Sequence, residues 1–151
     1  MYARILVPLE NTRWDRIILH HVRPLARLHG SELLLIHVAD GFAARNLAQL
    51  DLRESEEMRK DRAYLDQQAA ALNAEGFAAD AVLGCGDPAT EIAAAAERER
   101  CDLIAMSTHG HRFFGDLIHG SVANELRHRT MVPLLLVRGD PDRPLESSAS
   151  A

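Results

Sequence analysis

The 151-residue chain has little of the residue types that mark several protein classes. Its two cysteines, Cys85 and Cys101, form neither a CxxC zinc pair nor the dense framework of a secreted disulfide scaffold, so a reducing compartment is expected. No apolar stretch approaches the roughly 18 residues that a membrane span needs, and the first residues do not resemble a signal peptide. Lysine and arginine total 17 against 22 aspartates and glutamates, and the net charge of −5 disfavours binding to a nucleic-acid backbone. We therefore expect a cytoplasmic protein without a membrane or nucleic-acid partner.

What is present is the composition of one globular domain. Hydrophobic residues make up 47% of the chain and charged residues 26%, an ordinary mix for a folded protein of this length. We expect a single domain over residues 1–138. The tail over 139–151, GDPDRPLESSASA, contains three residues that break helices and strands and ends in serine and alanine, so we expect it to be mostly disordered.

Short apolar runs alternate with longer segments of helical periodicity. The runs lack polar alternation, which is typical of strands buried on both faces of a sheet. The order of elements is βαβαβαβαβ, which predicts a doubly wound α/β domain with a mainly parallel sheet. In such folds ligands bind beyond the carboxyl ends of the strands, where strand order reverses. The expected strands are Ala3–Leu9, Glu32–Val38, Ala79–Leu83, Asp102–Met106 and Val132–Val137.

Four helices are expected between these strands, at about 17–28, 47–75, 88–100 and 121–128. The first includes Pro24, which removes one backbone hydrogen bond. The second ends before Gly76, a natural C-terminal signal. Asp87-Pro88 begins the third helix, with a carboxylate at the N-cap and proline at the first helical position.

The segment STHGHRFFGDLIHGS, from Ser107 to Ser121, follows the fourth strand and precedes the last helix. Gly110 permits positive φ and a close approach of the backbone. The helix that begins at Gly120-Ser121 presents free N–H groups and the positive end of its dipole, where a phosphate would fit. On spacing alone an alternative is equally supported, in which the glycines only turn the chain and Ser121 only caps the helix.

Together with three other segments, this motif resembles the universal stress protein family over nearly the whole domain. The nucleotide-binding branch of that family carries G-x2-G-x9-G-[S/T], and Ser107-x2-Gly110-x9-Gly120-Ser121 matches three of the four positions. The opening ILVPLENT is similar to the family's ILVPxDGS. GDPATEI and CDLIAMSTHG are similar to its G-x-P-x-x-x-I and aDLIvMgthG segments.

The resemblance implies a Rossmann-like five-stranded sheet of order 3-2-1-4-5 and binding of ATP, ADP or AMP, with or without Mg²⁺, in stress response. It implies that Glu10 lies near the adenine, that the backbone of Val38 meets the base and that residues 106–110 border the ribose. It also implies that the helix start at 120–122 binds the phosphates. The expected nucleotide-binding residues are Pro8, Leu9, Glu10, Val38, Met106, Ser107, His109, Gly110, Gly120, Ser121 and Val122.

Several residues depart from the family pattern. Glu10 is one methylene longer than the usual aspartate, and Ser107 adds a side chain where glycine is common. Phe113-Phe114 brings bulk, and Asp116 brings negative charge, to the loop beside the expected phosphates. Because overpacking of this kind costs about 1–3 kcal/mol, we expect weak but measurable nucleotide binding that Glu10→Asp tightens.

Two alternatives stay open at this point. One is a nucleotide-independent dimeric interaction module of the same fold, whose pocket is blocked by Glu10 and Phe113. The other is a metal binder or enzyme that uses His109, His111 and His119, because imidazoles with a nearby carboxylate are a common zinc ligand set.

No motif for catalysis accompanies these residues. The chain lacks GxxxxGK[ST], a complete GxGxxG fingerprint and GxSxG, so we expect a binder rather than an enzyme. His37 is expected to be solvated or bonded to backbone, and the charge run Asp51–Arg62 to be a solvated helix face. Cys85 has the more exposed, glycine-flanked setting of the two thiols. The apolar last strand, at a sheet edge, predicts a homodimer that pairs through Val132–Val137.

Overall fold

The five strands of the chain form one parallel sheet. The computed structural model describes residues 1–40, 47–108 and 121–146. The strands lie in the order β3-β2-β1-β4-β5, and each hydrogen-bonded pair is parallel, which confirms the predicted fold class and strand order. Their bounds are β1 Arg4–Pro8, β2 Glu32–Asp40, β3 Ala79–Gly86, β4 Leu103–Thr108 and β5 Leu134–Arg138.

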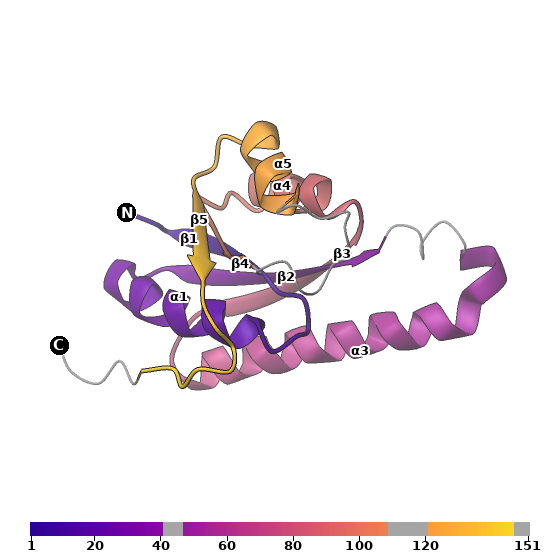
Figure 1. The fold of residues 1–151 in the computed structure, drawn as a ribbon, viewed down its shortest axis with the longest axis horizontal. Coiled ribbons are helices and arrows are strands. Elements are labelled where there is room, and N and C mark those ends of the chain that lie inside the picture. The colour runs from indigo at the N-terminus through magenta and orange to yellow at the C-terminus, as the bar shows by residue number, and fades with distance from the viewer. Residues whose placement is uncertain (41–46, 109–120, 147–151) are drawn as a thin grey trace.

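The described helices cover both faces of this sheet. They are α1 Asp15–His29, α3 Leu47–Ala74, α4 Pro88–Arg98 and α5 Ser121–Arg129. α1 and α3 pack on one face, and α4 and α5 pack on the other (Figure 1). α1 continues through Pro24 and ends at Gly30, which has a left-handed φ of 64° and donates its N–H to the carbonyl of Ala26. In the described part of the chain, no helix combines the length and apolar composition that crossing a membrane requires.

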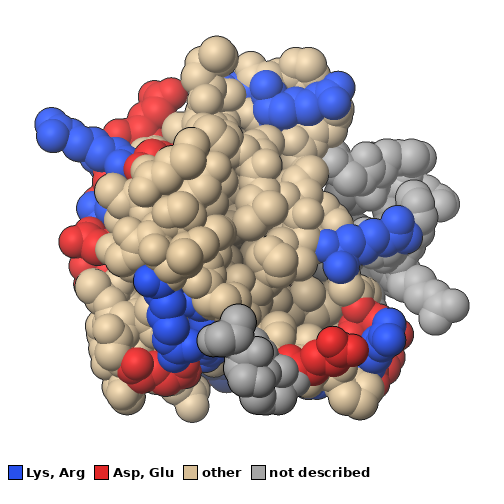
Figure 2. Space-filling view, turned by 90° about the vertical axis from the view of Figure 1, so that its left-hand side faces the viewer, with Lys and Arg blue, Asp and Glu red and all other residues tan. Residues whose placement is uncertain are grey.

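On one side of the domain the charged side chains lie around the periphery. Figure 2 shows the side that lies at the left of Figure 1, where the N-terminus, α1 and β5 are found. Lys, Arg, Asp and Glu side chains lie mainly around its periphery and leave the centre uncharged. β5 is an edge strand, and two strongly exposed hydrophobic side chains, Met131 and Leu136, lie just before it and within it.

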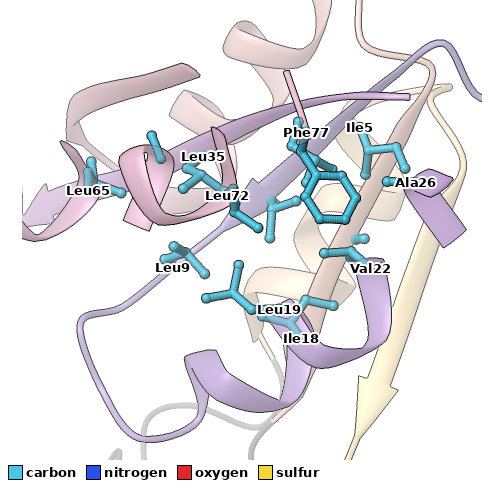
Figure 3. Close-up of a cluster of buried hydrophobic side chains, with 14 of the residues drawn as sticks. Ile5, Leu9, Ile18, Leu19, Val22, Ala26, Leu35, Leu65, Leu72 and Phe77 are labelled. Atoms are coloured by element: carbon cyan, nitrogen blue, oxygen red, sulfur yellow. The ribbon is translucent and has the colours of Figure 1, made fainter. Parts of the chain in front are cut away.

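The core lies in two layers, one on each face of the sheet. Side chains alternate along a strand, so the apolar runs of β1, β2 and β4 supply both layers, which is why these runs show no polar alternation. Figure 3 shows the layer beneath α1 and α3, where side chains from both helices meet those of the strands. This layer includes Ile5, Leu9, Ile18, Val22, Leu35, Leu65, Leu72 and Phe77; the other includes Leu6, Leu34, Ile36, Ile92, Ile104 and Leu126.

The strand ends differ from those predicted. β2, β3 and β4 each extend two or three residues further, because backbone pairing continues past the apolar runs; β2 and β3 stay in register as far as Asp40 and Gly86. β5 begins only at Leu134, after Pro133, which has no N–H to donate to a ladder. The carboxyl edge of the sheet is therefore longer than hydrophobicity alone indicates.

The segment after β5 lies against α1. Asp142 pairs with Arg13 at 2.7 Å, and Arg16 donates to the carbonyl of Pro141 at 3.3 Å. A Cβ on Gly139 would stand only 2.8 Å from Cγ2 of Ile17, so this close approach requires glycine. Residues 147–151 lie outside the described residues, and disorder of the tail stays a prediction.

Candidate functional site

The candidate site lies at the carboxyl ends of β1 and β4. β1 pairs with β2 on one side and with β4 on the other, so strand order reverses between β1 and β4. In doubly wound sheets a crevice opens at such a reversal, because the connections leave it in opposite directions. The carboxyl ends of β1, β2 and β4 therefore lie side by side along the same end of the sheet.

Pro8, Leu9 and Glu10 lead from β1 into the loop before α1. Leu9 donates its N–H to the carbonyl of Ile36 at 2.8 Å, and its side chain is buried in the core beneath α1 and α3. The side chain of Leu9 is therefore out of reach of a ligand, and its N–H is already bonded within the sheet. Glu10, the next residue, is exposed at the edge of the sheet.

A buried carboxylate shapes this loop. Asp15 Oδ1 accepts the N–H of Glu10 at 3.0 Å, and Oδ2 accepts those of Asn11 and Thr12 at 2.9 and 3.3 Å. Asn11 has a left-handed φ of 58°, which asparagine tolerates better than most residues. Asp15 is only 2% exposed, and by binding three consecutive N–H groups it holds the loop near one backbone conformation.

Tyr64 on α3 completes the environment of Asp15. Its hydroxyl donates to Asp15 Oδ2 at 2.6 Å. Burial raises the pKa of Asp15, while the hydrogen bonds from Tyr64 and from the loop oppose that rise. Burial, and then the contact with Asp15, raise the pKa of Tyr64. Neither residue was among the predicted site residues, because their contact joins α1 and α3 and a contact between distant segments is not visible in the sequence.

His37 and Asp61 form a second link between this loop and α3. His37 Nδ1 lies 2.9 Å from the carbonyl oxygen of Leu9, which confirms the prediction of a backbone-bonded histidine, and Nε2 lies 3.2 Å from Asp61 Oδ2. Asn11 Nδ2 donates to Asp61 Oδ1 at 3.4 Å. Asp61 is thus half-buried, and the prediction that its charge run is only a solvated face is wrong at this end. The signal that sequence reasoning missed is its helical spacing from the buried Leu65.

Three other predicted residues share the opposite face of the sheet. Val38 and Val122 are half-buried against the core beneath α4 and α5, and Met106 is buried within that core. A Cβ on Gly84 of β3 would lie 3.3 Å from Cγ2 of Val38, so β3 approaches Val38 closely. Ser107 is half-buried in β4. The structure therefore places Val38, Met106 and Val122 on one face of the sheet, with Ser107 near the end of β4.

α5 begins at Ser121, as the motif predicts within one residue. Its first N–H groups have no partner within the helix, and its first turn contains no acidic residue. An anion at this end of the helix would therefore meet the positive end of the dipole without a competing carboxylate from that turn.

The remaining predicted residues, His109, Gly110 and Gly120, lie outside the described residues. So do Phe113 and the histidines of the metal alternative, His111 and His119. Within the ranges 1–40, 47–108 and 121–146, no group of three His, Cys, Asp or Glu side chains is placed to hold a metal ion.

A concavity lies away from this edge of the sheet, between α1, β5 and the segment after β5. Its volume is about 350 Å³, and its lining contains none of the predicted nucleotide-binding residues. Arg138 and Arg143 face it together with Asp140 and Glu146, so its fixed charges balance. This balance gives no preference for an anionic ligand.

Comparison with known proteins agrees with the fold and the motifs. A model of the universal stress protein family matches residues 1–138. A universal stress protein of Thermus aquaticus is 34% identical over 91% of this chain and 100% of its own length. Universal stress protein MJ0577 of Methanocaldococcus jannaschii is 27% identical, with 91% of this chain and 96% of that protein covered.

Solved structures show the same architecture. The structure of MJ0577 matches with a TM-score of 0.81 at 26% identity, covering 93% of this chain and 98% of that one. A universal stress protein solved with cAMP matches with a TM-score of 0.66 at 15% identity, covering 91% and 97% of the two chains. One from Archaeoglobus fulgidus, solved with dAMP, matches with a TM-score of 0.62 at 19% identity, covering 89% and 97%. The latter two share the fold with this chain.

Proposed function

This chain belongs to the universal stress protein family, and from that premise we propose that it binds an adenine nucleotide, ATP or a related one, in a stress-response regulatory role. The observation that carries the proposal is the convergence of the ordered β1–α1 loop and the start of α5 on one edge of the sheet. Val122 in the first turn of α5 packs on the same core layer as Val38. The two ends of a nucleotide would thus meet different chemistry within one crevice.

The residues present fit such a ligand. Val38 offers an apolar wall to a base, and the main-chain carbonyl oxygens of the loop after β1 offer acceptors in a conformation that Asp15 holds by binding the N–H groups of that loop. Ser107 would border the ribose, and the first N–H groups of α5, at Ser121 and Val122, would donate to the phosphates. The relatives solved with cAMP and dAMP support an adenine nucleotide as the ligand class.

We propose binding without catalysis. A bound nucleotide would bring negative charge and a flat base to the site. Its binding would alter the segment between β4 and α5 and thereby the contacts of this segment with partner proteins. Hydrolysis of ATP would be slow or incidental, because the sequence carries no Walker lysine. We place this role in the cytoplasm, in keeping with two free thiols, Cys85 and Cys101.

Calorimetric titration with ATP, ADP and AMP, with and without Mg²⁺, tests the proposal. We expect weak binding by the wild type and about tenfold tighter binding by Glu10→Asp, because the shorter side chain relieves crowding near the base. Glu32 is the first residue of β2 and lies at the amino ends of the strands, away from the candidate site. The Glu32→Asp variant, which carries the same change there, should bind ATP like the wild type. If the wild type and the Glu10→Asp, Phe113→Gly double variant both fail to bind at millimolar ATP, the protein is a nucleotide-independent interaction module.

We also propose that the chain forms a homodimer through the predicted edge segment Val132–Val137. β5 lies at the edge of the sheet, Leu136 is 48% exposed and the surrounding face is largely uncharged (Figure 2). Light scattering should give twice the chain mass of 16.7 kDa for the wild type and the single mass for Leu136→Glu. Leu28→Glu, which alters an exposed leucine on α1, should stay dimeric. A wild-type mass of one chain at all concentrations would contradict the dimer.

A further inference from the structure

His37 joins the two segments that would face the base. It precedes Val38 directly on β2, and its ring bonds the carbonyl of Leu9, the residue before Glu10. Its side chain is 16% exposed, and that of its partner Asp61 is 22% exposed, so water competes little for these contacts. One side chain therefore couples β1, β2 and α3 at the candidate site.

Both ring nitrogens of His37 face oxygen atoms that can only accept. Nδ1 lies 2.9 Å from the carbonyl of Leu9, and Nε2 lies 3.2 Å from the carboxylate of Asp61. A neutral imidazole carries one N–H and would set a lone pair against one of these oxygens, whereas the imidazolium donates to both. Both hydrogen bonds of the ring, to Leu9 and to Asp61, therefore form only when each ring nitrogen of His37 carries a proton.

In the described part of the chain, the neighbouring elements add little other charge at the ring. The loop after β1 presents the Leu9 carbonyl, and β3 presents the apolar register partner Leu83. α3 presents Asp61 and, one turn on, Tyr64, whose hydroxyl is committed to Asp15. Glu10 follows Leu9 in the loop and is exposed. Asp61 is the charged group that contacts the ring.

We propose that His37 is a positioning residue for the nucleotide, whose imidazolium, held by Asp61, fixes the main chain of Leu9 and Glu10 against β2. This inference rests on the proposed function and names a regulation of the same site. Histidine is the side chain whose charge changes between about pH 5 and 8. Nucleotide affinity is accordingly highest when His37 is protonated and falls as it loses its proton, since one of its two hydrogen bonds is then lost.

Asp61→Asn separates this role from a merely structural one. The amide oxygen of the new side chain can still accept from Asn11, while its N–H group donates to a neutral Nε2 of His37. His37 Nδ1–H still donates to Leu9, so the neutral ring completes both of its hydrogen bonds. Loss of the His37 proton should therefore cost this variant no hydrogen bond, so its affinity should not show the part of the wild-type fall with pH that comes from His37.

Calorimetric titration of ATP from pH 5.5 to 8.5 tests the inference. The wild type should lose about three- to tenfold in affinity relative to Asp61→Asn as pH rises, the ratio expected for one hydrogen bond. The phosphates of ATP also titrate in this range, but identically for both proteins, so the difference isolates His37. His37→Gln, which can reach Asp61 but not Leu9, should bind about three- to tenfold more weakly at low pH.

The matched control is Glu75→Gln, which breaks another link to α1, the ion pair of Arg23 with Glu75 just after α3. It should keep the wild-type affinity and pH profile. Parallel wild-type and Asp61→Asn profiles, or wild-type affinity in His37→Gln at low pH, would overturn the inference alone. Absence of ATP binding by every variant overturns the proposed function and with it this role. NMR of the ligand-free protein gives a second measurement: the Glu10 amide should shift with His37 protonation in the wild type, and an amide that does not respond would also overturn the inference.

Discussion

The hydroxyl of Tyr64 lies 2.6 Å from the carboxylate of Asp15, so one side chain of α3 bonds the group that organises the β1–α1 loop. Asp15 is 2% exposed, and its other hydrogen bonds come from loop N–H groups. α3 thereby supports the conformation of a loop on another element.

Tyr64→Phe should lower the free energy of unfolding by about 1–3 kcal/mol, because a buried carboxylate loses a donor without gaining water. Urea denaturation measures the change. Tyr2→Phe removes a hydroxyl near the N-terminus and should have a smaller effect. Equal losses in the two variants would show that the Asp15 contact contributes nothing specific.

Glu75→Gln should reduce stability at neutral pH but not in acid. The hydrogen bonds from Arg23 lower the pKa of Glu75, so its stabilisation is present above the unfolded value of 4.5 and is lost as pH falls through the folded value. The side chain of Glu75 is 37% exposed, and such pairs contribute only about 0.2–1 kcal/mol. Denaturation at pH 7 and pH 3 tests this sign; a difference that grows in acid would refute it.

Asp87→Ala should destabilise α4 by about 0.5–2 kcal/mol. Asp87 Oδ2 accepts the N–H of Thr90 at 3.0 Å and its hydroxyl at 2.6 Å, which confirms the predicted N-cap. Asp87→Ser retains an acceptor at the cap and should recover most of the loss in thermal unfolding. Failure of serine to recover stability would indicate that the cap hydrogen bond is unimportant.

The two thiols should react at very different rates. Cys85 is exposed, whereas Cys101 is 6% exposed and burial raises its pKa to about 11. Because the thiolate is the nucleophile, an aromatic disulfide reagent should modify one thiol rapidly in the native protein and both in urea. Cys85→Ser should abolish the rapid phase; a rapid phase that persists would place the reactive thiol at Cys101.

Ser121→Asp should weaken ATP binding by about three- to tenfold relative to Ser121→Asn, which has the same shape without the charge. The added carboxylate would compete with the phosphates for the N–H groups at the start of α5, the end proposed to bind them. Calorimetry compares the two variants. Equal ATP affinities of the two variants would show that the phosphates do not bind at this end of the helix.

The strands were predictable because their chemistry is local. ILV in β1 and LLLI in β2 are apolar without alternation, and the structure buries both faces of these strands. Their ends were not predictable, because pairing as far as Asp40 and Gly86 depends on the neighbouring backbone and not on hydrophobicity. Strand order came from the resemblance to a family, since the alternation of elements alone permits several orders.

The site was predictable only in part, for a related reason. Glu10 follows β1 and Val38 lies near the end of β2, so both motif positions are visible in the sequence. Asp15, Tyr64 and Asp61 act through contacts between elements separated by tens of residues. In the sequence, Asp61 is one of many charged residues of a long helix. Only the fold shows that it lies beside His37.

The pairing of β1 with β4 constrains the order in which the chain can fold during its synthesis. Ile5 and Leu103 are register partners, so the ribosome must synthesise about two thirds of the chain before the central strand meets its second neighbour. Until then a nascent β3-β2-β1 half-sheet leaves one edge of β1 open, and such edges invite aggregation. Because contacts distant in sequence form slowly, this late closure should be the slow step of folding and the stage at which a chaperone would matter.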